Sequence, residues 1–120
     1  THLDNCGNDF RSVELEIILD FVKKNCADNP VVMTADWNEN DEHSLFNDLY
    51  KTFKNARFTA SITDRGATFN NFGANTDYLR IDHVFYKGFA SCSKFAVERR
   101  AWNGHAYISD HYPIYATLHF

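Results

Sequence analysis

Three short segments of the chain concentrate side chains that could act on a phosphate ester. They are residues 34–38 (Thr-Ala-Asp-Trp-Asn), 81–83 (Ile-Asp-His) and 109–113 (Ser-Asp-His-Tyr-Pro). Each segment places an Asp, with an Asn or a His beside or near it, between an apolar run and a turn. Carboxylates bind hard divalent cations, and an imidazole paired with a carboxylate can take a proton from water. Together the segments contain the parts that metal-assisted hydrolysis of a phosphoester requires.

Asp36 and Asn38 lie two residues apart, directly after a short apolar run. If the chain stays extended there, both side chains point the same way. Asp36 would then present a carboxylate, and the Asn38 amide on the same side could donate a hydrogen bond to a phosphate oxygen. An isolated Asp-x-Asn would more simply mark the end of a strand and the start of a turn. Beside the other two segments, we interpret it as part of a site.

Asp82 lies in an apolar strand pattern, where burying a carboxylate costs free energy unless it has a partner. His111 is the expected partner, because its loop could fold back over the strand. An Asp that orients an imidazole and stabilises its protonated form produces a useful general base. By strand alternation His83 points to the opposite face, and we interpret it as a packing or surface residue.

The adjacent Ser109, Asp110 and His111 do not predict a serine hydrolase. Neighbouring residues on an extended chain point in different directions, so these three cannot form the required relay. The chain also lacks a G-x-S-x-G elbow.

Apolar spacing and turn signals predict the elements that would position these residues. A helix is expected over residues 8–25 and a second one over 41–53. Strands are expected at residues 1–3, as the end of a strand, and over 31–36, 80–86, 94–99 and 114–120. Residues 56–75 indicate loops around a short extended piece, and Asn103-Gly104 predicts a turn. This order suits an α/β layered domain.

The composition fits one small globular domain. The chain has 120 residues, 44% hydrophobic and 16% aromatic, which is enough for a packed core and argues against disorder. Its net charge of −4 is opposite to that of a typical non-specific DNA binder, although a bound cation would offset it locally. The three cysteines are widely spaced and lack a C-x-x-C, so we expect free thiols. No apolar stretch approaches the roughly 20 residues that span a bilayer, no signal peptide is visible, and the opening without Met leads us to expect part of a longer protein.

With residues 1–4 (Thr-His-Leu-Asp), the three segments resemble the endonuclease/exonuclease/phosphatase superfamily. Its members include nucleases of the DNase I kind, inositol-phosphate phosphatases and sphingomyelinases. Asp36 and Asn38 match the family's Gly-Asp-x-Asn motif, with Ala35 in place of its usual Gly and Trp37 in place of its usual Phe. These two differences change the size of supporting residues and leave the chemistry in place.

The resemblance implies a role for each candidate residue. His111 would be the general base that accepts a proton from the attacking water, and Asp82 would orient it. His2 would stabilise the charge that develops on the phosphate in the transition state. Asp36 and Asn38 would position the water and the phosphate.

The resemblance also implies a DNase I-like four-layer α/β/β/α sandwich, with Mg²⁺ or Mn²⁺ bound by Asp110 and Asp36. Residues 1–120 would form the C-terminal half of this domain, with one mixed sheet and its flanking helices. The N-terminal half, which carries the principal metal-binding Glu, would be absent. The expected function is metal-dependent hydrolysis of a phosphoester in nucleic acid, a phosphoinositide or another phosphate ester. The alternative is a truncated, inactive half-domain that self-associates or binds a partner, such as its upstream half, across an exposed sheet face.

Four arginines carry weaker expectations. By resemblance, Arg11 makes a structural ion pair at the start of the first helix. Arg57, Arg65 and Arg80 could contact phosphate, and the sequence does not choose among them.

The segment over residues 67–73 also recurs in the superfamily. Its Thr68 and Asn70 either line the substrate groove or belong to an aromatic-rich loop that packs on the sheet. The remaining histidines match no motif and are expected at the surface: His43, His105 and His119.

Overall fold

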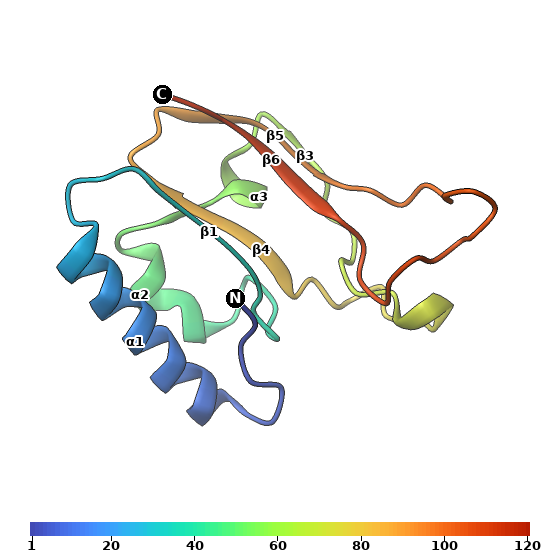
Figure 1. The fold of residues 1–120 in the computed structure, drawn as a ribbon, viewed down its shortest axis with the longest axis horizontal. Coiled ribbons are helices and arrows are strands. Elements are labelled where there is room, and N and C mark those ends of the chain that lie inside the picture. Colours follow the sequence, from blue (N-terminus) through green and yellow to red (C-terminus); the bar gives the residue numbers. More distant parts are fainter.

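Helix α1 (Asn8–Asn25) occupies the range that the sequence predicts. Asp9 lies in its first turn and Lys23 and Lys24 in its last, where their charges complement the helix dipole. The computed structural model describes residues 1–120 as an α/β fold, in which α1 and the short α2 (Asn47–Tyr50) lie on the same side of strand β1 (Figure 1). None of its helices has the combination of length and apolar character that crossing a membrane demands.

The first sheet brings two of the candidate segments side by side. Strand β1 (Val31–Asp36) pairs antiparallel with β4 (Asp82–Lys87), and the register places Asp36 opposite Asp82. The short β2 (Lys54–Asn55) pairs with β4 as well. The two aspartates therefore lie at the same end of neighbouring strands.

The second sheet contains β3 (Ile62–Thr63), β5 (Ser91–Val97) and β6 (Ile114–His119). Strand β5 pairs parallel with β3 and antiparallel with β6. The prediction of one mixed sheet is therefore wrong, because the strands form two three-stranded sheets and only the second is mixed. Strands β1 and β2 already occupy both edges of β4, so β5 has no edge left to join there.

Strand β4 is buried on both faces, and its two faces belong to two separate cores. Phe85 packs with Trp37 and Phe46 in a cluster that joins the strand to the helices. The alternate residues Val84 and Tyr86 pack in a second cluster with residues of β5. The layers are therefore helices, first sheet and second sheet, with β4 at the centre.

The second predicted helix, over residues 41–53, is mostly wrong. A 3-10 turn (Ser44–Phe46) and the single turn of α2 replace it. His43 fixes the start, because its Nδ1 accepts a hydrogen bond from the Leu45 N–H at 3.1 Å. Asp41 is fully buried in an ion pair instead of lying in a solvated first turn.

The remaining elements are short, and several strand boundaries differ from the prediction. A single-turn helix α3 (Ala56–Thr59) and a 3-10 turn (Asn71–Gly73) lie in the region expected to be loops. Strand β5 begins three residues earlier than the predicted Lys94, at Ser91. The turn at Asn103-Gly104 is confirmed, since both residues have positive φ.

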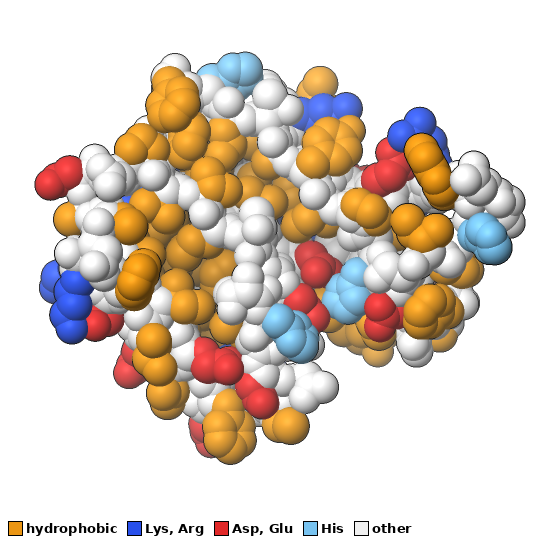
Figure 2. Space-filling view, viewed as in Figure 1, with side chains coloured by type: hydrophobic (Ala, Val, Ile, Leu, Met, Phe, Trp, Pro, Cys, Tyr) orange, Lys and Arg blue, Asp and Glu red, His pale blue; other side chains and the backbone are white.

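The molecule is a plate, 45 × 35 × 22 Å, with apolar side chains on its surface. Figure 2 shows hydrophobic side chains gathered over much of one face. Along α1, the exposed apolar residues recur at helical spacing, whereas Leu15 and Val22 are buried. The exposed residues of this stripe are Phe10, Val13, Ile17 and Phe21.

Candidate active site

Two aspartates form the base of the site, one on each of the central strands. Asp36 ends β1 and Asp82 begins β4, directly opposite each other. Burial is the main cause that raises the pKa of Asp36 above its ordinary value. The Asn38 backbone N–H donates to the Asp36 carboxylate at 2.8 Å and opposes this rise, while the charge of Asp82 adds to it. A carboxylate in this position gains from a nearby cation.

His111 bridges the two aspartates. Its Nδ1 lies 2.9 Å from Asp82 Oδ2, and its Nε2 lies 3.7 Å from Asp36 Oδ2. A carboxylate accepts hydrogen bonds, so Nδ1–H donates to Asp82 and Nε2 is left able to accept a proton. The side chain is 26% exposed, which keeps it within reach of water. The predicted pairing of Asp82 with His111 is therefore confirmed.

His2 reaches the same carboxylate from the start of the chain. The Thr1 amino group donates to Thr34 O at 3.0 Å and the Leu3 N–H to Asp36 O at 2.9 Å, so this segment runs parallel to β1. The arrangement places His2 Nε2 3.2 Å from Asp36 Oδ2. Residues 1–3, predicted to be the end of a strand, form a single parallel bridge between His2 and Asp36 and no strand of their own.

Asn38 joins the group through a backbone conformation that the sequence did not predict. Its φ is 51°, in the left-handed region that Asn tolerates better than most residues, so the chain is not extended there. The amide nevertheless lies on the Asp36 side, because its Nδ2 is 3.0 Å from His2 Nε2 and donates to Leu3 O at 2.6 Å. Trp37, between the two, is fully buried.

Asp110 is the one predicted site residue that stands apart. The ligand atoms of Asp36, Asp82 and His111 all lie within 4.8 Å of one another, and Asp110 is outside this group. The Asp110 carboxylate accepts a hydrogen bond from the Ser109 hydroxyl at 3.3 Å. Its role as a metal ligand stays a prediction.

The donor set suits a hard divalent cation. Carboxylate oxygens are the ligands of Mg²⁺ and Mn²⁺, and Mn²⁺ also accepts an imidazole. Asp36 and Asp82 would share the coordination of such a cation with their present contacts to Asn38, His2 and His111. Figure 2 shows acidic and histidine side chains side by side at a recess on this face of the molecule.

The loop over residues 67–73 positions both halves of the Asp–His pair. Thr68 is fully buried, and its hydroxyl oxygen accepts from the N–H groups of Ile81 and Asp82, both at 3.0 Å. The Thr68 carbonyl accepts from the Tyr112 N–H at 2.7 Å. Thr68 therefore links the start of β4 to the loop that carries His111. Of the two roles considered for this segment, the contacts of Thr68 fit a loop that packs on the sheet better than a residue that lines a substrate groove.

Asn70 holds the same loop from its other side. Its backbone N–H donates to Asp110 O at 2.7 Å, and its side chain donates to Ser109 O at 3.1 Å. Phe69, which the sequence did not single out, lies between the two and places its ring 4.9 Å from that of His111. Its position as an aromatic residue inside a segment that recurs in the family was the sequence feature that could have identified Phe69 as part of the site.

The other histidines lie outside the site, as expected, although two of them have structural roles. His83 is buried, and its Nε2–H donates to Glu39 O at 2.8 Å. Burial lowers the pKa of His83 to about 4. His43 caps a 3-10 turn, while His105 and His119 are exposed.

Three of the four arginines that the sequence singles out make ion pairs within the protein. Arg11 lies 3.3 Å from Glu39, which confirms its predicted ion pair. Arg57 is buried and lies 2.8 Å from the buried Asp41, so it is not free to contact phosphate. Arg80 approaches the same carboxylate at 3.6 Å.

The comparison with protein families covers most of the chain. Residues 4–111 match the model of the Endonuclease/Exonuclease/phosphatase family. A search of curated proteins found no match.

Solved structures of the same fold superpose closely. An endonuclease/exonuclease/phosphatase from Bacteroides vulgatus shares 26% identity with a TM-score of 0.83, over 98% of this chain and 46% of its own. The mannosyl-6-phosphatase Bt3783 of Bacteroides thetaiotaomicron shares 21% with a TM-score of 0.79, over 99% and 49%. D. rerio TDP2, complexed with a single-strand DNA product, shares 18% with a TM-score of 0.74, over 99% and 54%.

At 21% and 18% identity, the last two structures show a common fold alone. The chain spans about half the length of each of these structures. Because the family match extends over nearly the whole chain and the motifs meet at one site, the chain belongs to the Endonuclease/Exonuclease/phosphatase family.

Proposed function

We propose that the protein containing this chain is a divalent-metal-dependent phosphoester hydrolase. The observation that carries the proposal is the contact of His111 with both Asp82 and Asp36, at 2.9 and 3.7 Å, from three separate segments of the chain. An imidazole that donates one N–H to a carboxylate and keeps its other nitrogen free is a general base.

In the proposed reaction, His111 Nε2 takes a proton from water while the water oxygen attacks phosphorus. The bond from phosphorus to the leaving oxygen breaks, the leaving oxygen takes up a proton from solvent and departs as an alcohol, and His111 returns its proton to solvent. Asp82 stabilises the imidazolium, and His2 and Asn38 donate hydrogen bonds to the phosphate oxygens. Asp36 and Asp110 would hold Mg²⁺ or Mn²⁺, which when bound neutralises phosphate charge.

We also propose that residues 1–120 are the C-terminal half of a four-layer α/β/β/α sandwich. The match to about half of each solved structure supports this division. The upstream half would supply further strands, the outer helices of the opposite side and a further metal ligand. Function then resides in the complete domain.

The test uses the chain joined to its upstream half. Chelation of divalent cations by EDTA should abolish hydrolysis of a generic phosphodiester, and re-addition of Mg²⁺ or Mn²⁺ should restore it. His111→Ala should lose nearly all turnover, because no other side chain occupies its position between the aspartates. His105→Ala, at an exposed turn away from these contacts, is the matched control. Unchanged hydrolysis after either treatment refutes the mechanism.

The second candidate is an inactive half-domain that self-associates. The exposed Phe10, Val13, Ile17 and Phe21 on one face of α1 favour it, because such stripes attract partners. Sedimentation of the isolated chain should then give a dimer, and Ile17→Glu should give a monomer. Hydrolysis by the 120 residues alone eliminates this candidate.

The net charge of −4 favours a small phosphoester or lipid headgroup over long duplex DNA. Two structures of the same fold, a mannosyl-6-phosphatase and a TDP2 complexed with a single-strand DNA product, suggest a sugar phosphate and DNA as the first substrates to try. A parallel screen of single- and double-stranded DNA, RNA, phosphoinositides, sphingomyelin and mannose 6-phosphate would identify the class.

A further inference from the structure

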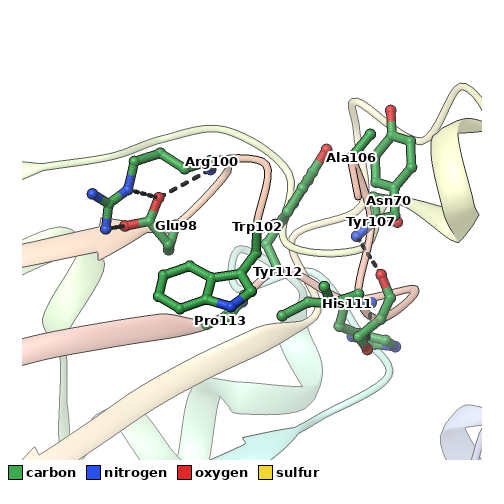
Figure 3. Close-up of a pocket in the computed structure, with 11 residues that line it drawn as sticks. Asn70, Glu98, Arg100, Trp102, Ala106, Tyr107, His111, Tyr112 and Pro113 are labelled. Atoms are coloured by element: carbon green, nitrogen blue, oxygen red, sulfur yellow. Dashed lines mark hydrogen bonds and ion pairs between the residues drawn. The ribbon is translucent and has the colours of Figure 1, made fainter. Parts of the chain in front are cut away.

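A cavity of about 330 Å³ opens beside His111 (Figure 3). The connection between β5 and β6 supplies almost all of its wall, and Asn70 adds to it from the neighbouring loop. Small-molecule sites begin at about this size. Because His111 is itself part of the wall, a group in the cavity lies next to the proposed general base.

The wall is mainly aromatic and apolar. Trp102, Tyr107 and Tyr112 contribute rings, and Ile108 and Pro113 complete the surface. The ring centroids of Tyr107 and Tyr112 lie 6.4 Å apart. A phosphate would lose its hydration against such a wall without gaining enough donors in return. The cavity therefore suits the group to which the phosphate is attached.

Trp102 is held in place by a tight hairpin turn. Its N–H donates to His105 O and the His105 N–H donates back to Trp102 O, both at 2.9 Å. Between them Asn103 and Gly104 have φ of 48° and 81°, the left-handed values that such a two-residue turn requires. Trp102 is 61% exposed, so the protein's own core leaves most of its apolar surface free.

The charged and amide side chains of the wall, Arg100, Glu98 and Asn70, are already paired with protein groups. Arg100 donates from Nε to Glu98 Oε1 at 2.9 Å, and its Nη2 lies 2.8 Å from Glu98 Oε2, as Figure 3 shows. The Asn70 side chain donates to Ser109 O and accepts from the Phe72 N–H. A sugar needs partners for many hydroxyl groups and would find few here. A flat aromatic ring needs only ring faces to stack on.

We propose that this cavity, the ring pocket (Trp102, Tyr107, Ile108, Tyr112 and Pro113), binds an aromatic ring of the substrate while the phosphate lies at Asp36 and His111. A nucleoside monophosphate has the required chemistry, and the charge of −4 disfavours a long polyanion. The inference rests on the proposed phosphoester hydrolysis and names the substrate class for that site. Trp102 is then a specificity-determining residue.

The test compares ligands that share a phosphate and differ in their ring. Calorimetric titration of the complete domain, in the presence of Mg²⁺ and with the His111→Ala change that prevents turnover, gives the affinities for AMP, ribose 5-phosphate and mannose 6-phosphate. AMP should bind roughly 5- to 100-fold more tightly than ribose 5-phosphate, the range that stacking of one base on an aromatic side chain supports. AMP should also quench tryptophan fluorescence, because Trp102 is exposed and the other tryptophan, Trp37, is fully buried.

Two variants with the same initial exposure separate the ring pocket from general surface effects. Trp102→Ala should bring the ratio of AMP to ribose 5-phosphate affinity close to one. Phe21→Ala, which removes another 61%-exposed aromatic residue on α1, should keep the wild-type ratio. Equal affinities for the two ligands, tighter binding of mannose 6-phosphate than of AMP, or no binding of any of them at millimolar concentration overturns the inference.

The experiments distinguish failure of the ring-pocket inference from failure of the proposed hydrolase function. If EDTA and His111→Ala abolish hydrolysis while AMP shows no preference, the ring pocket alone is refuted. If AMP is preferred through Trp102 but hydrolysis does not depend on metal, the hydrolase mechanism alone is refuted.

Discussion

His83 should make the stability of the protein fall steeply below neutral pH. Its Nε2–H donates a hydrogen bond to Glu39 O, and its Nδ1 is buried among aromatic rings without a hydrogen-bond partner. A second proton would therefore place a charge where no acceptor can stabilise it. This burial lowers the pKa of His83 from its ordinary 6.5 to about 4.

The sign and size follow from the two pKa values. Between about pH 6.5 and pH 4 the unfolded chain binds a proton at His83 and the folded chain does not, so the free energy of unfolding decreases as the pH falls. Each pKa unit corresponds to about 1.4 kcal/mol, so the full loss is about 3 kcal/mol, and about 2.5 kcal/mol of it is reached near pH 4.5. Below pH 4 the loss should level off.

Urea denaturation at a series of pH values measures this loss. His83→Gln removes the titrating group and keeps a side-chain N–H for Glu39 O, so its free energy of unfolding should decline less than that of the wild type by about 2.5 kcal/mol. The rise in the pKa of Asp36 acts in the opposite direction and cancels in this comparison. His105→Gln, in an exposed turn, should follow the wild type. Parallel curves for His83→Gln and the wild type would refute the reasoning.

Three further substitutions probe the supports of the site. Asp82→Asn should lower kcat/KM by about 10²–10⁴-fold, because His111 loses the carboxylate that orients it and stabilises its protonated form. Steady-state kinetics measures this loss, and circular dichroism checks that the variant stays folded. Thr68→Val removes the acceptor of the Ile81 and Asp82 N–H groups and should cost about 2 kcal/mol in urea unfolding; a neutral effect would mean that these bonds do not hold the strand. Arg57→Met leaves the buried Asp41 carboxylate with Arg80, 3.6 Å away, as its remaining cation and should cost about 3 kcal/mol, part of which the added change Asp41→Leu should recover.

The parts of the fold that local sequence dictates were predictable. The 3.6-residue period and charged ends fix α1, and the apolar run before Asp36 fixes β1. The Asp82–His111 contact also followed from the sequence, because a carboxylate in an apolar strand demands a partner. For α1, β1 and the Asp82–His111 contact, a single rule of local spacing or burial cost was enough to predict the structure.

The features that depend on distant partners were not predictable. The helix expected over residues 41–53 fails because Asp41 is buried against Arg57, a pairing that no spacing rule reveals. The division into two sheets depends on the two-residue strand β2, which occupies an edge of β4. The exposed Trp102 looks like any other aromatic residue until the turn and the cavity around it are known.

The central claim is that Asp82 and His111 act as one unit on a phosphoester. A double-mutant cycle with Asp82→Asn, His111→Ala and the double variant, in the complete domain and with the phosphoester selected by the screen, measures this directly as kcat/KM. The double variant should be no slower than His111→Ala alone, because Asp82 works only through the imidazole. Losses that multiply in the double variant would contradict the central claim.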